Sequence, residues 1–359
     1  MRKWLRRLLK ILLAAVCIAL LAAAAPIAWV ELDCVGKPGP AGEPAYQPIV
    51  DPEHRRSEIN TYVTYPEWSI VHAYEDFAGV VRAKNESDFA YFSSIRGYWS
   101  NLCAMTAHAS AQGDIEADVK AMLYTIGVSF AAEMGVKGAY EQTIGRVTEA
   151  IRGEKRTPED RFALAVAEDY ARFLQQTPWY DYPFGTTLKR FWSEVPWEEG
   201  NLVRKLERRV GLTVEYGAKA LYAQIIGALA GIAPAALRIR SVVRGIDGSD
   251  LAIDPRIERI EARPDGTVVI DTPRYREFTQ ILLALASRGR DVVEIAGNDD
   301  IFVTLLMPPS APAAKGKLLI TVPLQARPGW RRDGLVIKVA ALGELMRNVG
   351  SQFEHAYDY

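Results

Sequence analysis

The sequence predicts a multi-domain protein with an N-terminal transmembrane helix, an all-α domain built from a tandem duplication, and a small C-terminal α+β domain with an antiparallel sheet. Three observations predict this class. A long uncharged run follows a basic N-terminus, two helical blocks match each other, and the hydrophobic period then shortens from that of a helix to that of a strand. The predicted parts are a basic tail with anchor at 1–31, a Pro/Gly-rich linker at 32–64, helical units at 65–150 and 157–232, and the α+β domain at 249–359.

The N-terminal segment predicts the cellular compartment. Five cations in "MRKWLRRLLK" precede "ILLAAVCIALLAAAAPIAWV", an uncharged run of about twenty residues that is long enough for a bilayer core. Cations stay cytoplasmic, so the rest of the chain is expected on the other side, as a single-pass protein of the bacterial inner membrane with its bulk in the periplasm. A cleaved signal peptide is the alternative, although cutting after Ala25 would leave Pro26 beside the scissile bond.

The overall charge excludes one class of partner. Lys and Arg number 43 against 44 Asp and Glu, so no net field attracts nucleic acid. Apolar residues make up 49% and charged residues 24%, which is a globular composition. The expected partners are the membrane and a protein or a lipid, and not nucleic acid.

The three cysteines differ in their surroundings. Cys17 lies within the anchor, whereas Cys34 and Cys103 would lie outside the cytoplasm, where a disulfide is allowed. A Cys34–Cys103 bridge would attach the segment after the anchor to the first helical unit, and two free buried thiols are the alternative. The chain contains no CxxC pair or Cys/His cluster that would predict zinc.

The two helical units match in four blocks that occur in the same order. Glu-Asp-Phe-Ala at 75–78 recurs as Glu-Asp-Tyr-Ala at 168–171, and three further pairs follow. These are Asp88-Phe89 with Asp181-Tyr182, "IRGYWS" with "LKRFWS", and "EMGVKGAYEQTIG" from Glu133 with "EYGAKALYAQIIG" from Glu215. The first helix is expected from Tyr65 with Pro66 in its first turn, and Thr157 is expected to cap the corresponding helix that starts with Pro158. A tandem duplication of a helix–connector–helix unit explains all four matches.

A second membrane span near 216–237 is a further possibility. Residues 220–237 carry no formal charge and reach the lower length limit for a span. The corresponding helix of the first unit contains Glu141, Arg146 and Glu149, which argue against a span there. A core helix or one that rests on the membrane is therefore the alternative.

The C-terminal region shows strand-like alternation. "IERIEARPDGTVVIDT" predicts a hairpin around a Pro-Asp-Gly turn, and "DVVEIAGNDDIFVTLLMP" and "KLLITVPLQARPGWRRDGLVIKV" predict two more. A helix is expected between them, with Thr272 as its cap, Pro273 first and Gly289 after its end, and a last helix runs through "ALGELMRNVGSQFEHAYDY". Six strands and two helices would form one antiparallel sheet with helices on one face.

No catalytic residue is assigned, although six polar residues are candidates because helical spacing can bring them together. They are His72, Glu75, Glu133, Lys137, Glu215 and Lys219. General acid–base catalysis by a buried Glu/Lys pair is one interpretation, and inter-helix ion pairs that fix the packing of the two units are the other. A di-metal oxidase is not expected, because the chain has no Glu-x-x-His and His72 corresponds to Ala165 in the second unit. No cofactor or metal is expected, and His108 and His355 are expected at the surface.

The run "YPEW", "EDFA", "YWS" and Cys103 resembles membrane-anchored proteins of proteobacteria to which no activity is attached. The resemblance implies placement in the cell envelope and transfers no site residue. Two functions follow as hypotheses. The first is a non-enzymatic envelope protein that binds or scaffolds a partner through a duplicated helical domain, and the second is an enzyme that acts on a lipid-like or membrane-proximal substrate through the duplicated Glu/Lys face.

Overall fold

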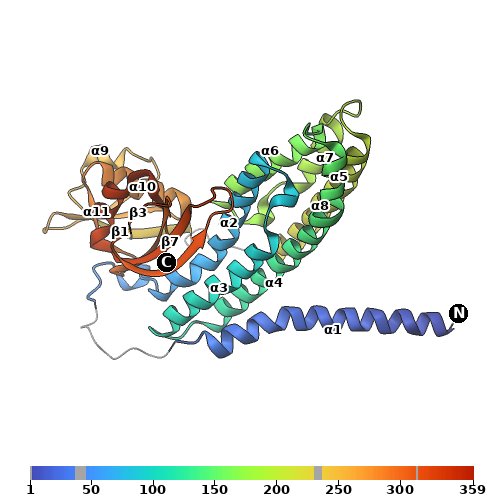
Figure 1. Ribbon diagram of the computed structural model, residues 1–359. Helices are drawn as coiled ribbons and strands as arrows, with labels where there is room; N and C mark the ends of the chain where they lie inside the picture. Colours follow the sequence, from blue (N-terminus) through green and yellow to red (C-terminus); the bar gives the residue numbers. More distant parts are fainter. Residues whose placement is uncertain (1, 37–45, 230–236, 313) are drawn as a thin grey trace.

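A helical N-terminal part and a C-terminal domain with two antiparallel sheets make up the chain (Figure 1). The computed structural model describes residues 2–36, 46–229, 237–312 and 314–359. Helix α1 extends away from the rest of the molecule, and the sheets lie at the opposite end from the N-terminus (Figure 1). The helices of the N-terminal part are α1 (Arg2–Asp33), α2 (Ile59–Ala83), α3 (Tyr91–Ser110), α4 (Ala117–Tyr140), α5 (Arg146–Arg152), α6 (Pro158–Leu174), α7 (Phe184–Glu194) and α8 (Leu202–Leu229).

Helix α2 begins at Ile59, six residues before the predicted start at Tyr65, so the predicted linker 32–64 extends too far. Pro66 lies inside the helix, where its missing N–H leaves the carbonyl of Tyr62 without the usual partner. The extra turns form nonetheless because Tyr62 and Tyr65 are fully buried against the core. Tertiary burial therefore outweighs the local preference of proline for the first turn of a helix.

Helices α4 and α5 form one continuous rod. A π-helical segment at Glu141–Gly145 joins them, so the helical path runs from Ala117 to Arg152. Helix α4 packs on α3, and two of its glycines allow the close approach. A Cβ at Gly127 would lie 2.3 Å from the Tyr98 ring, and one at Gly138 would lie 2.7 Å from Cβ of Tyr91.

The order of elements in 59–152 recurs in 158–229. In the first stretch, α2 is followed by a 3₁₀ turn at Glu86–Asp88, then by α3 and the α4–α5 rod. In the second, α6 is followed by a 3₁₀ turn at Trp179–Asp181, then by α7 and α8. The predicted cap of α6 is confirmed, because Thr157 accepts a hydrogen bond from the backbone of Asp160. Helix α8 is described to Leu229, so the end of the second span expected near 216–237 lies partly outside the described residues.

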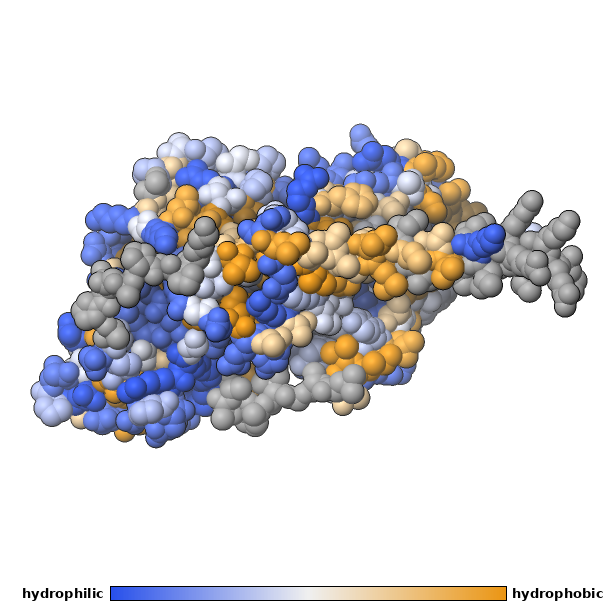
Figure 2. All heavy atoms as spheres, turned by 90° about the horizontal axis from the view of Figure 1, so that it is seen from below, coloured by the Kyte–Doolittle hydropathy of each residue, from blue (hydrophilic) through white to orange (hydrophobic). Residues whose placement is uncertain are grey.

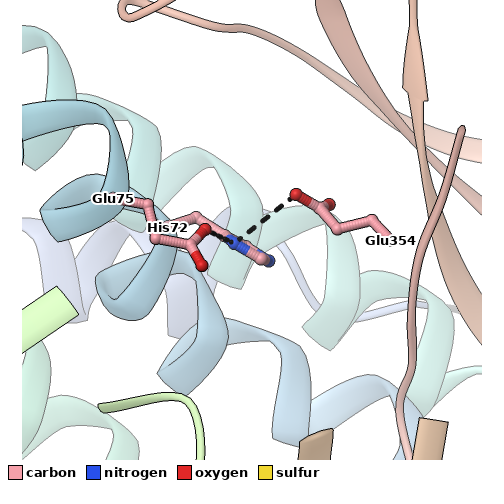
Figure 3. Close-up of side chains that lie close together, drawn as sticks. All are labelled: His72, Glu75 and Glu354. Atoms are coloured by element: carbon pink, nitrogen blue, oxygen red, sulfur yellow. Dashed lines mark hydrogen bonds and ion pairs between the residues drawn. The ribbon is translucent and has the colours of Figure 1, made fainter. Parts of the chain in front are cut away.

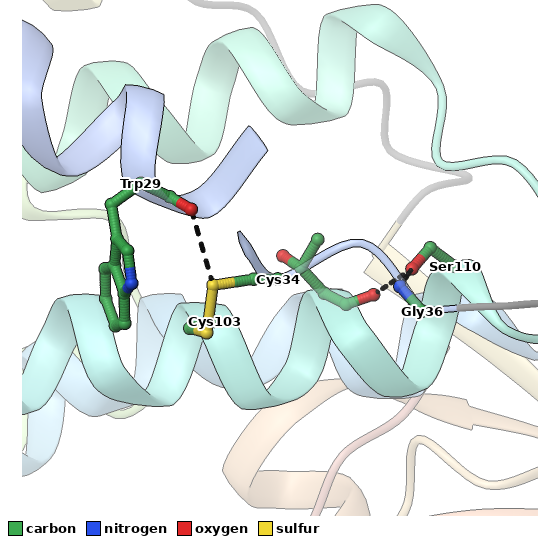
Figure 4. Close-up of a disulfide and its surroundings, with 6 residues drawn as sticks. Trp29, Cys34, Gly36, Cys103 and Ser110 are labelled. Atoms are coloured by element: carbon green, nitrogen blue, oxygen red, sulfur yellow. Dashed lines mark hydrogen bonds between the residues drawn. A yellow bond between two sulfur atoms is a disulfide. The ribbon is translucent and has the colours of Figure 1, made fainter. Parts of the chain in front are cut away.

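A disulfide between Cys34 and Cys103 joins the end of α1 to α3 (Figure 4). The backbone of Gly36 donates to the hydroxyl of Ser110 at 2.7 Å, and Ser110 lies about two turns after Cys103 on α3. Glu31 accepts from Lys120 and Tyr124 of α4. The C-terminal end of α1 is therefore attached to the helical bundle by a covalent bond and by polar contacts.

The C-terminal domain contains two four-stranded antiparallel sheets, where one sheet of six strands was expected. Their orders are β2-β3-β1-β4 and β6-β7-β5-β8. The strands are β1 (Arg238–Arg244), β2 (Glu258–Ala262), β3 (Thr267–Pro273), β4 (Asp291–Ile295), β5 (Asp300–Met307), β6 (Lys317–Pro323), β7 (Arg331–Lys338) and β8 (Phe353–Ala356), and the helices are α9 (Gly248–Leu251), α10 (Tyr275–Ser287) and α11 (Val339–Val349). The domain begins with β1 and so before the predicted boundary at 249.

Two of the three predicted hairpins form, and the third does not. The hairpins β2–β3 and β6–β7 form as expected. Strands β4 and β5, predicted as a hairpin, belong to different sheets, because β4 pairs with β1 and β5 pairs with β7 and β8. The last helix ends at Val349, where Gly350 adopts a positive φ of 52°, and the chain then returns as strand β8. Thr272 and Pro273 end strand β3, so α10 starts two residues later than predicted, at Tyr275.

Helix α2 connects the two parts of the molecule. The Thr61 hydroxyl donates to the carbonyl of Tyr357 and accepts from the backbone of Phe302. Asp76, near the other end of α2, accepts from the backbone N–H groups of Gln325 and Ala326. These contacts hold the second sheet directly against the helical core.

Candidate functional site

The structure divides the six candidate residues between two polar clusters whose members are buried or half-buried. Glu133 and Lys137 on α4 meet Glu215 and Lys219 on α8, and we call these four residues the cross-paired cluster. His72 and Glu75 on α2 lie elsewhere, against the second sheet. They form what we call the interdomain cluster with Arg332 of β7 and Glu354 of β8.

The cross-paired cluster consists of two reciprocal ion pairs. Lys219 Nζ lies 2.7 Å from Glu133 Oε1, and Lys137 Nζ lies 2.9 Å from Glu215 Oε1. Each glutamate therefore pairs with the lysine of the opposite helix. Within α8, Lys219 lies 3.7 Å from Glu215, so the two pairs also touch each other.

Each lysine lies near an aromatic ring at a corresponding position of its unit. Lys137 Nζ lies 4.6 Å from the centroid of the Phe77 ring, and Lys219 Nζ lies 4.9 Å from that of Tyr170. Phe77 packs on Phe89 and Tyr91, and Tyr170 packs on Tyr182 and Phe184 in the same manner. The lysines are thus stabilised both by carboxylates and by ring faces.

The cavity beside the cross-paired cluster is small. Its volume is about 30 Å³, which is room for one or two water molecules and not for a substrate. It lies between α2, α4, α6 and α8, and Tyr74 donates from the cavity wall to Glu133 at 2.5 Å. The four charged groups therefore interact with one another and with their neighbours, and the cavity beside them has no room for a substrate.

A second set of charges, which sequence reasoning missed, continues from this cluster toward the start of α8. Arg208 lies 2.8 Å from Glu141 and 3.2 Å from Glu86, and Arg204 lies 2.9 Å from Asp160. All five residues are buried. The charged run "RKLERR" at 204–209 could have indicated a network, but a run of this kind is more often a solvated surface.

The interdomain cluster centres on His72 (Figure 3). Its Nδ1 lies 2.8 Å from Glu75 Oε2 and 3.8 Å from Glu354 Oε1, and its Nε2 lies 3.1 Å from the Tyr357 hydroxyl. The other carboxylate oxygen of Glu75, Oε1, accepts a hydrogen bond from the side-chain amide of Gln175. Neither Glu354 nor Tyr357 was predicted at this site, because residues 350–359 were expected to be helical.

His72, Glu75 and Glu354 lie close enough together to hold a metal ion, but their surroundings do not fit one. Arg332 donates to both oxygens of Glu354, at 2.5 and 2.6 Å, and so already occupies the carboxylate in a bidentate manner. Burial alone would raise the pKa of Glu354, but the Arg332 charge outweighs burial and lowers it to about 2. A fixed guanidinium at this position repels a cation, so the cluster is a structural ion pair network.

His355, expected at the surface, is buried between the helical part and the sheet. Its ring stacks on Trp68 with a centroid distance of 3.7 Å, and its Nδ1 lies 3.1 Å from the Thr279 hydroxyl. Its Nε2 has no hydrogen-bond partner among the described residues. Burial, assisted by the nearby His72, lowers the pKa of His355 well below its ordinary value.

Comparison of the chain with protein-family models, with curated proteins and with solved structures finds no match. No residue role is therefore transferred from a relative. The functional argument consequently depends on the contacts and the burial of the residues themselves.

Proposed function

We propose that the chain is a single-pass protein of the bacterial inner membrane with its bulk in the periplasm, where it binds or scaffolds a partner at the membrane and does not act as an enzyme. One observation carries the proposal. The four charged residues repeated between the two helical units are engaged in reciprocal pairs beside a cavity of about 30 Å³. Groups held in this way serve the packing of two helices.

A tandem duplication is part of the proposal, and the contacts support it. Glu133 and Lys137 correspond in sequence to Glu215 and Lys219, with an offset of 82. If the two units are interchanged, the pair Glu133–Lys219 becomes the pair Glu215–Lys137. A pseudo-two-fold axis between α4 and α8 produces this relation. The equivalent aromatic sets around Phe77 and Tyr170, at an offset of 93, follow the same relation.

The placement in the envelope is supported by two features near the N-terminus. Helix α1, with its basic start and uncharged middle, is about 48 Å long and exceeds the thickness of a bilayer core. The Cys34–Cys103 disulfide follows it, and such bonds persist in oxidising compartments such as the periplasm. Both features agree with a cytoplasmic N-terminus and a periplasmic bulk.

The alternative is an enzyme that acts on a lipid-like or membrane-proximal substrate through the Glu/Lys face. It would require one of Glu133, Lys137, Glu215 and Lys219 to reach a substrate. The small cavity and the short ion pair distances argue against this alternative.

A charge-exchange cycle tests the structural role of the cluster. The variants are Glu133→Lys, Lys219→Glu and both together in the full-length protein in detergent, with the free energy of unfolding as the readout. Each single variant places like charges next to each other and should lose stability. The double variant restores the 133–219 pair and should recover part of the loss, since the carboxylate at position 219 then lies beside Glu215. Single variants as stable as the parent would contradict the proposal.

The placement needs a separate test at an exposed position. Tyr357 and Tyr359 are buried, so a reporter fused to the C-terminus would disturb the fold, whereas Leu318 on β6 is 53% exposed. A Leu318→Cys variant in a Cys17→Ser background should react with a membrane-impermeant maleimide in cells whose outer membrane alone is permeabilised. Labelling that requires lysis of the inner membrane would overturn the periplasmic placement.

A further inference from the structure

We propose that the outer face of the α4–α5 rod and α8 lies in the interfacial region of a lipid bilayer, with the bundle resting on the membrane surface. This inference deepens the proposed function and depends on its membrane placement. The outer face is defined by exposed apolar side chains on neighbouring helices. These are Met122, Val136, Ile144, Val147 and Ile151 of the rod and Val203, Leu206, Val210, Val214, Leu221 and Ile225 of α8.

Helix α8 has the reverse of the polarity expected for a helix in water. Its seven charged residues are all buried or half-buried; they are Arg204, Lys205, Glu207, Arg208, Arg209, Glu215 and Lys219. Every exposed residue of α8 whose side chain is described is uncharged, with Val210 and Val214 66% and 65% exposed. A surface helix of a water-soluble domain presents its charges outward, so this face is suited to an apolar environment.

The rod shows the same inversion. From residue 119 to residue 145, each of its exposed side chains is uncharged, and Val136 is 74% exposed. Glu141 and Glu149, two of the three charged residues that argue against a span, are buried toward Arg208 and Arg204. The third, Arg146, is exposed and donates to the Ser87 carbonyl. The outer side of the rod is therefore free of charged side chains from residue 119 to residue 145, and Arg146 is the exposed charge beyond that stretch.

The rod and α8 form one continuous surface because they lie side by side in opposite directions. Ser129 contacts Tyr222, Lys137 contacts Glu215, and Asn201 donates to the Ile151 carbonyl, so contacts extend along most of both helices. The surface is two helices wide and about 35 Å long, and a contiguous apolar surface of this extent is typical of an interaction or membrane site. A shallow apolar hollow of about 370 Å³ beside Ile144 and Val147 interrupts this surface.

The opposite side of the bundle excludes a complete span. Arg161 and Arg172 of α6 and Arg190 of α7 are each more than half exposed. These charges need water, so the bundle can place only one face in lipid, in the manner of an interfacial helix. Among the residues that the structure describes, the helix 117–152 is the one that is long and apolar enough to span a bilayer. Only 22% of its most apolar 18-residue stretch is buried inside the protein.

Lipid is the occupant that the position of the anchor favours. Glu31 near the end of α1 contacts Lys120 and Tyr124 of α4, so α1 leaves the bundle beside the rod. Viewed from below, hydrophobic residues gather along α1 and on the helical half of the molecule, whereas the half with the sheets is mostly hydrophilic (Figure 2). A partner protein would be expected to meet some charge on its docking surface, and the outer face offers none between residues 119 and 145.

Lipid contact can be measured with a fluorophore at single positions. The full-length protein with Cys17→Ser receives one further substitution, Val136→Cys, Val210→Cys or Leu318→Cys, and is labelled with NBD. It is reconstituted into vesicles of phosphatidylcholine and phosphatidylglycerol. At positions 136 and 210 the emission should shift to shorter wavelength, and it should be quenched by phosphatidylcholine with a doxyl group on its acyl chain but not by iodide in solution. Position 318 should show the reverse.

Each other outcome contradicts the inference. Quenching of positions 136 and 210 by iodide would mean that water covers the outer face. Protection from both quenchers would mean that protein covers it, either a second copy or another partner. A label at Leu13→Cys in α1, which is 63% exposed in the structure, separates this inference from the proposed function. Quenching by doxyl lipid at position 13 without quenching at 136 and 210 retains the anchor and overturns only the outer face.

Discussion

The α4–α8 pair and the C-terminal domain bury opposite kinds of side chain. In the C-terminal domain, Phe278, Leu285 and Leu342 are fully buried, and the edge strand β2 is exposed along its length with charged residues. In the α4–α8 pair, Arg204 and Arg208 are as deeply buried, while Val136 and Val210 are exposed. The first arrangement is that of a domain in water, and the second requires an apolar neighbour.

Because of this difference, stability and specificity arise from different interactions in the two regions. Apolar side chains that interdigitate stabilise the C-terminal domain without regard to direction. Buried ion pairs contribute little net stability, because desolvation offsets their attraction, but each pair is costly to break. The charges between α4 and α8 therefore fix which helices meet and in which register, and they allow the outer face to remain uncharged.

Removal of one buried charge is expected to give the largest effect. Arg208→Met leaves Glu86, Glu141 and Glu207 without their shared cation, and it should lower the free energy of unfolding by about 3–5 kcal/mol. The matched control is Arg190→Met, since Arg190 forms an exposed pair with Glu194 on α7 and should have little effect. Denaturant unfolding in detergent measures both variants, and equal losses would remove the distinction between interior and surface charge.

Truncation of an apolar side chain should cost more stability in the C-terminal domain than on the outer face of the α4–α8 pair. Leu285→Ala in α10 removes a fully buried side chain and should cost about 3 kcal/mol. Val210→Ala on the outer face should change stability by less than about 0.5 kcal/mol, because that side chain packs against no core. A large loss from Val210→Ala in the same detergent assay would show that the outer face is packed against protein.

Acid should weaken the contact between α2 and the C-terminal domain through His355. Its pKa is lowered by burial, so the unfolded chain takes up a proton below the ordinary pKa of about 6.5 while the folded chain does not. The stability due to the neutral ring is present above that pKa and decreases as the pH falls. Stability should therefore fall between pH 7 and pH 5 through the protonation of this group in the unfolded chain.

The variant His355→Phe isolates this contribution because it keeps a ring against Trp68. Glu67 acts in the opposite direction, since burial raises its pKa to about 7 and stabilises the fold as the pH falls. The informative quantity is therefore the difference between parent and variant, measured by denaturant unfolding at both pH values. An unchanged pH dependence in the variant would contradict the role of His355.

Local patterns allowed much of the fold to be predicted. The Thr157-Pro158 cap, the Pro-Asp-Gly hairpin and the β6–β7 hairpin all depend on neighbours in the chain. Strand β8 and the separation of β4 from β5 depend on partners far along the chain, which periodicity does not reveal. Repeated sequence brought Glu133, Lys137, Glu215 and Lys219 together as candidates, but the inward direction of Glu141 and Arg208 follows only from the packed helices.

The most direct test asks whether the outer face holds the protein on a membrane without its anchor. A protease site inserted within residues 37–45 allows the chain to be cut, and reduction of the Cys34–Cys103 bond then removes the covalent link to α1. A Glu31→Ala background removes the polar contacts of α1 with Lys120 and Tyr124, so that α1 can separate from the remaining part. After both steps in vesicles, we expect the C-terminal fragment to sediment with the lipid, and the same fragment with Val210→Asp and Val214→Asp to be released. Release of the unsubstituted fragment, or retention of the substituted one, would contradict a bilayer-facing surface on α4, α5 and α8.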